Sequence, residues 1–130
     1  MGFSLNKYNT KVNIDLKSGS YIFSADSSTG KTRLYKLLKD MQKWGEPVIS
    51  YSYGDYQYGV DLNSLVDRNQ HAKIVMIDRY DMFNGVYNDT IASLAKDKIV
   101  MVDCKNNVRF TDDDKICFIE MDKYSIVVEE

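Results

Sequence analysis

The sequence predicts an α/β protein, a compact three-layer structure in which helices cover both faces of a mostly parallel sheet. Strand-like segments alternate with segments of helical period along the 130 residues. Two strand-like segments, KIVMID at 73–78 and KIVMVD at 98–103, are apolar for four consecutive residues. Such runs are typical of strands covered on both faces of a parallel sheet. The length suits one hydrophobic core, so residues 1–130 are predicted to form a single small domain.

A β-hairpin is predicted near the N-terminus, over residues 11–25. Apolar and polar residues alternate from Val12 to Leu16, as in a half-buried strand. Residues 17–20 (KSGS) have the composition of a turn, and residues 21–25 (YIFSA) have that of a strand. We therefore expect the two strands to pair antiparallel.

An amphipathic helix of three or four turns is predicted to begin near Lys31. Its apolar residues fall at i, i+3, i+4 and i+7, at Leu34, Leu37, Leu38 and Met41. Gly45 and Pro47 end it. Arg33 lies on the first turn, where we expect it to face solvent.

The remaining chain is predicted to continue the alternation. A strand is expected at 48–53 and a short helix at 61–67, followed by the apolar strand that ends at Asp78. A second short helix at 88–95 precedes the strand that ends at Asp103. Strands at 116–121 and 124–128 are expected to form a C-terminal β-hairpin.

Acidic residues directly follow three of the predicted strands: Asp26, Asp78 and Asp103. In open α/β sheets, ligands bind beyond the carboxyl ends of the strands. We therefore expect these carboxylates at one edge of the sheet, beside the start of the helix at Lys31.

The stretch YIFSADSSTGKT at 21–32 places a strand, a loop and a helix start in succession. Such a turn directs unpaired backbone N–H groups into one concavity and forms an anion site. Gly30 supplies conformational freedom, and Lys31 would reach the β- and γ-phosphates of a nucleotide. The Thr32 hydroxyl and the Asp78 carboxylate would bind Mg²⁺.

These residues resemble the motifs of P-loop NTPases. Ile74 to Asp78 is similar to the Walker B motif, and Asp78 would hold the metal. Ala25 stands where the Walker A motif usually has its first glycine, a variant that the family tolerates. The resemblance implies that ATP or GTP binds with Mg²⁺ to the Walker A-like residues Ala25, Asp26, Ser27, Ser28, Thr29, Gly30, Lys31 and Thr32.

Within that superfamily the layout resembles the ABC and AAA branch, which has an extra strand between the two Walker strands. The segment 48–53 lies between the two motifs in the chain, and hairpins flank the nucleotide-binding core. The resemblance places Asp103 at the sensor position, near the γ-phosphate. A solvated carboxylate at a strand end is the alternative interpretation of Asp103.

Hydrolysis is expected to be slow or to need a partner, so any enzyme activity would be that of a weak ATPase or NTPase. Members of this branch usually place a glutamate after the Walker B aspartate to orient the attacking water. Arg79 occupies that position. Asp81 is the substitute we consider, with Lys31 and Asp103 as the other catalytic candidates.

Two other functions remain open. The segment Asp78–Tyr80 resembles the DRY segment of thymidylate-type kinases, although the chain leaves little room for a lid. Alternatively, the P-loop scaffold serves as a binding module, such as an accessory factor of a phage or mobile element that inhibits host defence. The four tyrosines within Tyr51–Tyr58 would then stack on nucleic-acid bases or contact a protein partner, and the lack of nearby lysine or arginine favours the protein. The alternative is that Tyr51 and Tyr53 simply pack on one face of an edge strand.

Charge and composition limit the other partners. The formal net charge of −2 gives no basic field, so nucleic-acid binding would need a local patch. No segment has the length of a membrane helix, and the first ten residues lack a signal-peptide core. With only two cysteines, a cytoplasmic location is expected. The acidic run Asp112–Asp114 is either a second metal site or a solvated turn.

Overall fold

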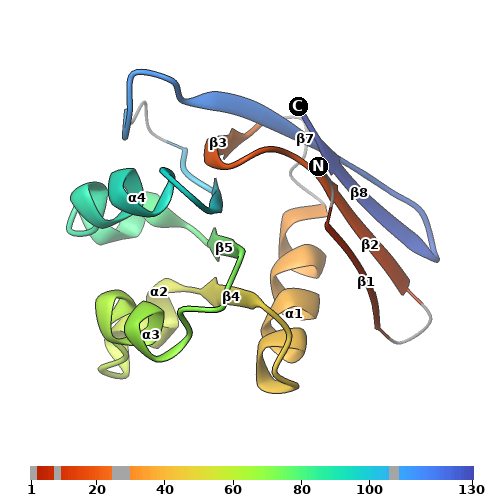
Figure 1. The fold of residues 1–130 in the computed structure, drawn as a ribbon, viewed down its shortest axis with the longest axis horizontal. Coiled ribbons are helices and arrows are strands. Elements are labelled where there is room, and N and C mark those ends of the chain that lie inside the picture. Colours follow the sequence, from red (N-terminus) through yellow and green to blue (C-terminus); the bar gives the residue numbers. More distant parts are fainter. Residues whose placement is uncertain (1–2, 8–9, 25–29, 106–108) are drawn as a thin grey trace.

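The computed structural model describes residues 3–7, 10–24, 30–105 and 109–130 (Figure 1). The strands in these residues are β1 (Phe3–Lys7), β2 (Thr10–Asp15), β3 (Gly19–Phe23), β4 (Val48–Tyr51), β5 (Ile74–Ile77), β6 (Ile99–Val102), β7 (Lys115–Met121) and β8 (Ser125–Glu129). The helices are α1 (Gly30–Lys43), α2 (Tyr53–Gln57), α3 (Leu62–Arg68), α4 (Asn88–Leu94) and the 3₁₀-helix η2 (Tyr80–Phe83).

The strands form one sheet in the order β1-β2-β8-β7-β3-β6-β5-β4. The five strands from β7 to β4 are mutually parallel, and β2 also runs parallel to β8. Only β1–β2 and β7–β8 are antiparallel among the described pairs. The predicted α/β class with a mostly parallel sheet is therefore confirmed, and so is the C-terminal hairpin.

The predicted pairing of the N-terminal hairpin is wrong. β2 does not pair with β3; it pairs antiparallel with β1 and parallel with β8. β3 lies in the middle of the sheet between β6 and β7. Alternating hydrophobicity indicates which face of a strand is buried, but it does not specify the neighbouring strand. The N-terminal hairpin is formed instead by β1 and β2.

The strand predicted at 48–53 differs from the expectation in its position in the sheet and in the residue at which it ends. β4 lies at the edge of the sheet, and β6 is the strand that separates β3 from β5. The chain turns into α2 after Tyr51 because Ser52 and Asp55 form a capping box. The Ser52 hydroxyl accepts a hydrogen bond from the Asp55 N–H, and the Asp55 carboxylate accepts one from the Ser52 N–H.

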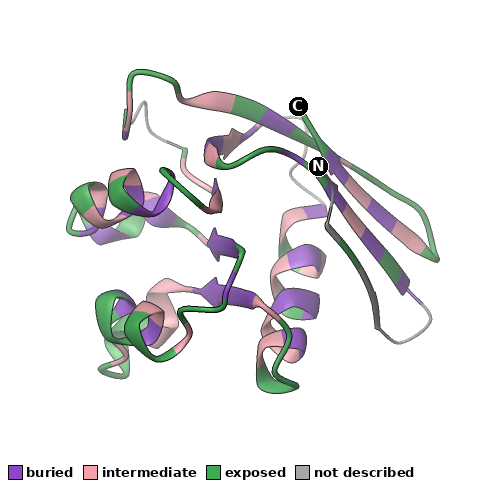
Figure 2. Ribbon diagram, in the orientation of Figure 1, coloured by how far each residue is buried: buried purple, intermediate pink, exposed green. Residues whose placement is uncertain are grey.

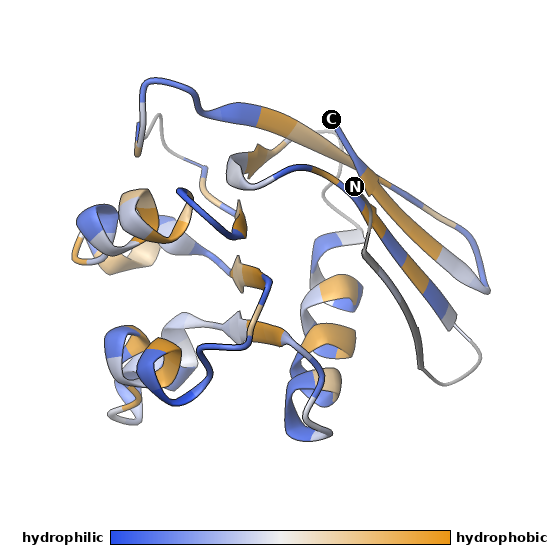
Figure 3. Ribbon diagram, in the orientation of Figure 1, coloured by the Kyte–Doolittle hydropathy of each residue, from blue (hydrophilic) through white to orange (hydrophobic). Residues whose placement is uncertain are grey.

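α1 packs in the concave side of the sheet, between the central strands and the β8–β2 region (Figure 1). Its predicted apolar stripe is buried, with Leu34 and Leu38 fully inaccessible. The same core contains Val12 of β2 and Val128 of β8. Along β2 and β8, buried residues alternate with exposed or half-buried ones (Figure 2). Hydropathy alternates in the same way along β2, whereas β8 has a continuous hydrophobic run (Figure 3). One face of this part of the sheet therefore covers α1.

The other helices cover the opposite face of the central strands. Along β5, Met76 belongs to the core around α1, whereas Val75 and Ile77 belong to the core beneath α3, η2 and α4. This second core is rich in aromatic rings, including Tyr51 stacked on Phe83 at 5.7 Å between centroids. Both faces of β5 are therefore apolar, which explains its unbroken hydrophobic run.

Both ends of α1 are fixed by identifiable contacts. A Cβ atom at Gly30 would lie 2.7 Å from Cγ2 of Ile119, so the start of α1 approaches β7 too closely for a side chain. Arg33, which we expected to face solvent, is half-buried and donates hydrogen bonds to the carbonyls of Asp122 (2.8 Å) and Lys123 (3.0 Å). At the other end, Gly45 has φ +84° and closes the helix, as predicted.

No helix in the described part of the chain is long and apolar enough to cross a membrane.

Candidate functional site

Polar residues directly follow three neighbouring strands at one edge of the sheet. Asp103 follows β6, Asp78 follows β5 and Ser52 follows β4. Backbone pairing continues into the first two: the Asp103 N–H donates to the carbonyl of Ile77, and the Asp78 N–H donates to that of Tyr51, both at 2.8 Å. The carboxyl ends of these parallel strands therefore hold the three side chains in register. We call this edge the carboxyl rim.

Lys31 reaches the carboxyl rim from the first turn of α1. Its Nζ donates a hydrogen bond to Oδ1 of Asp103 at 2.8 Å. The two side chains are only 15% and 14% exposed. Because this ion pair is shielded from water, it is screened less than a surface pair.

Asp78 lies beside this ion pair. Burial raises its pKa to about 6, and the charge of Asp103 and a hydrogen bond with Asp103 add to the rise, whereas Arg79 and Lys31 oppose it. Lys31 therefore interacts with two neighbouring carboxylates, Asp103 through the ion pair and Asp78 through its charge. The structure brings Lys31, Asp78 and Asp103 together.

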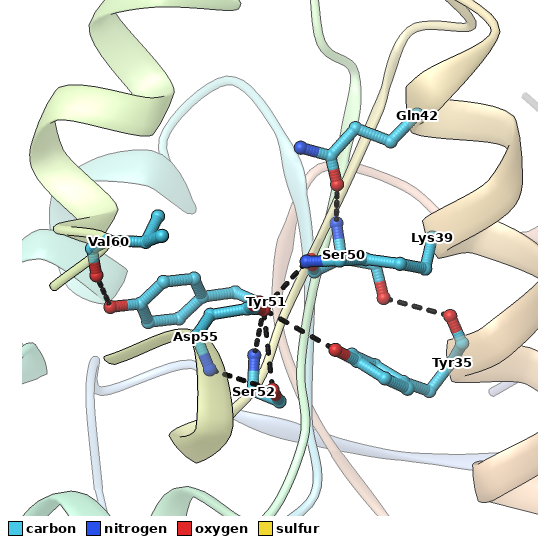
Figure 4. Close-up of polar contacts among 8 residues, drawn as sticks. All are labelled: Tyr35, Lys39, Gln42, Ser50, Tyr51, Ser52, Asp55 and Val60. Atoms are coloured by element: carbon cyan, nitrogen blue, oxygen red, sulfur yellow. Dashed lines mark hydrogen bonds and ion pairs between the residues drawn. The ribbon is translucent and has the colours of Figure 1, made fainter. Parts of the chain in front are cut away.

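A second polar cluster lies along the outer edge of β4 (Figure 4). Lys39 Nζ donates to Oδ2 of Asp55 at 2.7 Å and to the Ser50 carbonyl at 3.0 Å. Gln42 Oε1 accepts from the Ser50 N–H at 2.9 Å. Side chains of α1 therefore satisfy backbone groups that an edge strand would otherwise leave open.

Tyr35 connects the two clusters. Its hydroxyl donates to Oδ2 of Asp55 at 3.4 Å. Burial raises the pKa of Tyr35; a hydrogen bond with Ser52 opposes this rise, and the negative charges of Asp55 and Asp78 support it. Tyr35 therefore lies within the electrostatic reach of the carboxyl rim.

Sequence reasoning missed Tyr35 and Ser52, although a signal was present for each. Lys31, Tyr35 and Lys39 are spaced by four residues and lie on one stripe of α1. Ser52 follows an apolar strand just as Asp78 and Asp103 do.

The other predicted site residues that the structure describes divide between the start of α1 and the segment that follows β5. Gly30 is buried and Thr32 is exposed, both at the start of α1. Asp81 is half-buried on η2 and takes no part in the ion pair between Lys31 and Asp103. Arg79 is exposed and adopts the left-handed conformation, with φ 52°. The remaining Walker A-like residues fall outside the described part of the chain: Ala25, Asp26, Ser27, Ser28 and Thr29.

The donor atoms at the carboxyl rim fit Mg²⁺. Burial and the nearby Asp103 carboxylate both raise the pKa of Asp78, and a bound divalent cation would favour the charged form against both effects. Carboxylate oxygens suit a hard cation. Among the described residues no three His, Cys, Asp or Glu side chains cluster as metal ligands. Mg²⁺ commonly uses one or two protein carboxylates and takes its other ligands from phosphate and water.

The acidic run Asp112–Asp114 has a structural role at Asp114. Its carboxylate accepts hydrogen bonds from the N–H groups of Phe110 (2.6 Å) and Thr111 (3.0 Å), and from the Ser20 hydroxyl. Burial raises the pKa of Asp114, but these hydrogen bonds together bring it below the ordinary value. Asp114 therefore ties the turn before β7 to β3.

The tyrosine-rich segment divides between core and surface. Tyr51 is fully buried, and its hydroxyl donates to the Val60 carbonyl and lies 3.3 Å from the Tyr87 hydroxyl. Tyr53 is half-buried against the same core. Tyr58, in contrast, is 92% exposed. Any partner contact in this segment would therefore involve its second half.

Comparisons with protein-family models, curated proteins and solved structures gave no match to this chain.

The raised pKa of Asp78 predicts a specific pH dependence of stability in protein freed of divalent cations. Below the unfolded pKa of 3.8 the side chain is protonated in both states; between 3.8 and about 6 the folded protein holds the extra proton. The contribution of Asp78 to the free energy of unfolding should therefore fall as pH rises through this window, so the wild type should lose stability relative to Asp78→Asn. At pH 7, Asp78→Asn should raise it by roughly 1–2 kcal/mol, allowing for partial solvent screening.

Urea unfolding between pH 4 and pH 7 measures this effect. Asp81→Asn provides a matched control, because it removes a nearby carboxylate that lies outside the ion pair. If Asp78→Asn destabilises the protein at pH 7, the account of repelling carboxylates is wrong.

Proposed function

We propose that this protein binds a nucleoside triphosphate, ATP or GTP, together with Mg²⁺ at the carboxyl rim. The observation that carries the proposal is the position of Lys31. It lies on the first turn of the 14-residue helix α1, and its Nζ is held 2.8 Å from Asp103 and near Asp78.

The start of α1 supports binding of a polyphosphate. The first N–H groups of a helix have no intrahelical acceptor, and the helix dipole favours negative charge there. Lys31 adds a full positive charge at the same place. A bound phosphate would compete with Asp103 for Lys31.

Mg²⁺ would bind through the Asp78 carboxylate and the Thr32 hydroxyl, with Asp103 nearby. When bound, the ion would neutralise charge on the phosphate oxygens. Elements of the fold position each of these side chains. Asp78 and Asp103 follow β5 and β6, and α1 carries Thr32 and Lys31.

The strand order gives independent support. β6 lies between β3, which precedes the Walker A-like segment, and β5, which carries the Walker B-like aspartate. The resemblance to the ABC and AAA branch implies such an intervening strand. The proposal therefore fits both the motif and its place in the sheet.

Hydrolysis by the isolated protein should be slow. Arg79 stands at the position of the water-orienting glutamate, and Asp81 lies on the following 3₁₀-helix outside the Lys31–Asp103 pair. Phosphate release from Mg-ATP, measured with purified monomer, should therefore be far below the typical kcat of about 10 s⁻¹. Turnover at or above that rate would show that a base has been missed, and its loss in Asp81→Asn would identify Asp81.

Thermal melting with nucleotide tests the binding proposal directly. Mg-ATP or Mg-GTP at about a hundredfold excess over Kd should stabilise the wild type by about 2.7 kcal/mol. Lys31→Ala should abolish this shift because it removes the cation that faces the phosphates.

Lys39→Ala is the matched control. Like Lys31, Lys39 lies on α1 and forms an ion pair, with Asp55 at 2.7 Å. Both variants lose an ion pair and should melt somewhat lower than the wild type without ligand, but only Lys39→Ala should keep the nucleotide shift. The binding proposal fails if no nucleotide shifts the wild type at millimolar concentration, or if Lys31→Ala keeps the full shift.

A second candidate function, docking of a protein partner, is favoured by one observation. Tyr58 is 92% exposed after α2, and Met82 (41%) and Val86 (53%) are exposed on and after η2. Tyrosine and methionine are enriched in protein–protein interfaces. Protein docking would become the preferred function if neither Mg-ATP nor Mg-GTP raises the melting temperature.

A further inference from the structure

The carboxyl rim extends beyond the residues that would hold Mg²⁺. β4 neighbours β5 in the sheet, so Ser52 lies one strand beyond Asp78, on the side away from Asp103. Tyr35 lies one helical turn beyond Lys31 on α1. The rim therefore has a charged part, made by Lys31, Asp78 and Asp103, and a neutral part made by the hydroxyls of Tyr35 and Ser52.

The Tyr35 hydroxyl, which also has a hydrogen bond with Ser52, donates only a long hydrogen bond to Asp55. Its hydrogen bond to Asp55 is 3.4 Å long, whereas hydroxyl donors usually lie 2.7–2.8 Å from their acceptors. The same Asp55 oxygen already accepts from Lys39 at 2.7 Å and from the Ser52 N–H at 3.0 Å (Figure 4). Asp55 would therefore remain satisfied if the Tyr35 hydroxyl turned to another acceptor.

A stronger acceptor would be present in the ligand-bound site. If phosphates bind at the start of α1 and Mg²⁺ at Asp78, a terminal phosphate could lie beside the neutral part of the rim, because Ser52 is one strand from Asp78 and the charge of Asp78 acts on Tyr35. Phosphate oxygens are charged and form stronger hydrogen bonds than a shared carboxylate contact of 3.4 Å. A diphosphate is one phosphate shorter, so it would not reach the hydroxyls of Tyr35 and Ser52.

We propose that the Tyr35 hydroxyl, with Ser52 beside it, binds the terminal phosphate and makes the site prefer a nucleoside triphosphate to a diphosphate. This inference rests on the proposed function, because it assigns the residues that recognise the far end of the same ligand. Tyr35 donates its proton in a hydrogen bond, and no covalent bond changes.

Calorimetric Kd values for Mg-ATP and Mg-ADP test the assignment. Tyr35→Phe keeps the aromatic ring that packs against the core but removes the hydroxyl. It should weaken Mg-ATP binding about tenfold, as expected for one hydrogen bond to a charged group, and leave the Kd for Mg-ADP nearly unchanged. Tyr21→Phe is the matched control, because its hydroxyl bonds to the Lys17 carbonyl before β3, at the other end of the sheet.

The outcomes separate this inference from the proposed function. A selective loss of Mg-ATP affinity in Tyr35→Phe, with Tyr21→Phe unchanged, supports both. If Lys31→Ala abolishes binding of both nucleotides but Tyr35→Phe changes neither or changes both equally, the role of Tyr35 is overturned and the proposed function stands. If the wild type binds neither nucleotide, both are overturned.

Discussion

The burial of α1 within the concave side of the sheet is the constraint on which the other features depend. Its apolar stripe packs against both the central strands and the β8–β2 region, which fixes the rotation of the helix about its axis. Gly30 and Arg33 fix its start against β7 and the turn that follows it. With the rotation and the start both fixed, the polar stripe of Lys31, Tyr35 and Lys39 must face the ends of the strands.

This placement of α1 brings one positive side chain together with two negative ones at the carboxyl rim. Two carboxylates at adjacent strand ends lie near one lysine, and burial together with the charge of Asp103 raises the pKa of Asp78 to about 6. Such an arrangement costs stability without a ligand, because a half-buried carboxylate is left near another of like charge. A polyphosphate with Mg²⁺ would supply both an anion for Lys31 and a cation for the carboxylates. Lys39 and Asp55, in contrast, form an ion pair in which the two charges balance, at the edge of the sheet beside β4.

Much of the fold could be predicted from the sequence, because local patterns carry most of it. The stripe from Leu34 to Met41, the capped helix at Asp61 and the two KIVM strands all depend on neighbouring residues. Strand partners depend on the whole sheet, so the pairing of β2 was mispredicted. At the site, Asp78 and Asp103 were indicated by their positions after strands, and Lys31 by the Walker A-like stretch before the helix. The role of Tyr35 depends on where α2 packs, and the close approach of Gly30 to Ile119 depends on β7.

A crystal structure with Mg²⁺ and a non-hydrolysable ATP analogue tests the central claim most directly, because it shows which group Lys31 binds. We expect a phosphate at the start of α1, with Lys31 Nζ bound to a phosphate oxygen in place of Asp103, its partner at 2.8 Å in the present structure. We also expect Mg²⁺ bound to the Asp78 carboxylate. A structure with the analogue bound elsewhere, and the ion pair between Lys31 and Asp103 intact, would contradict the account.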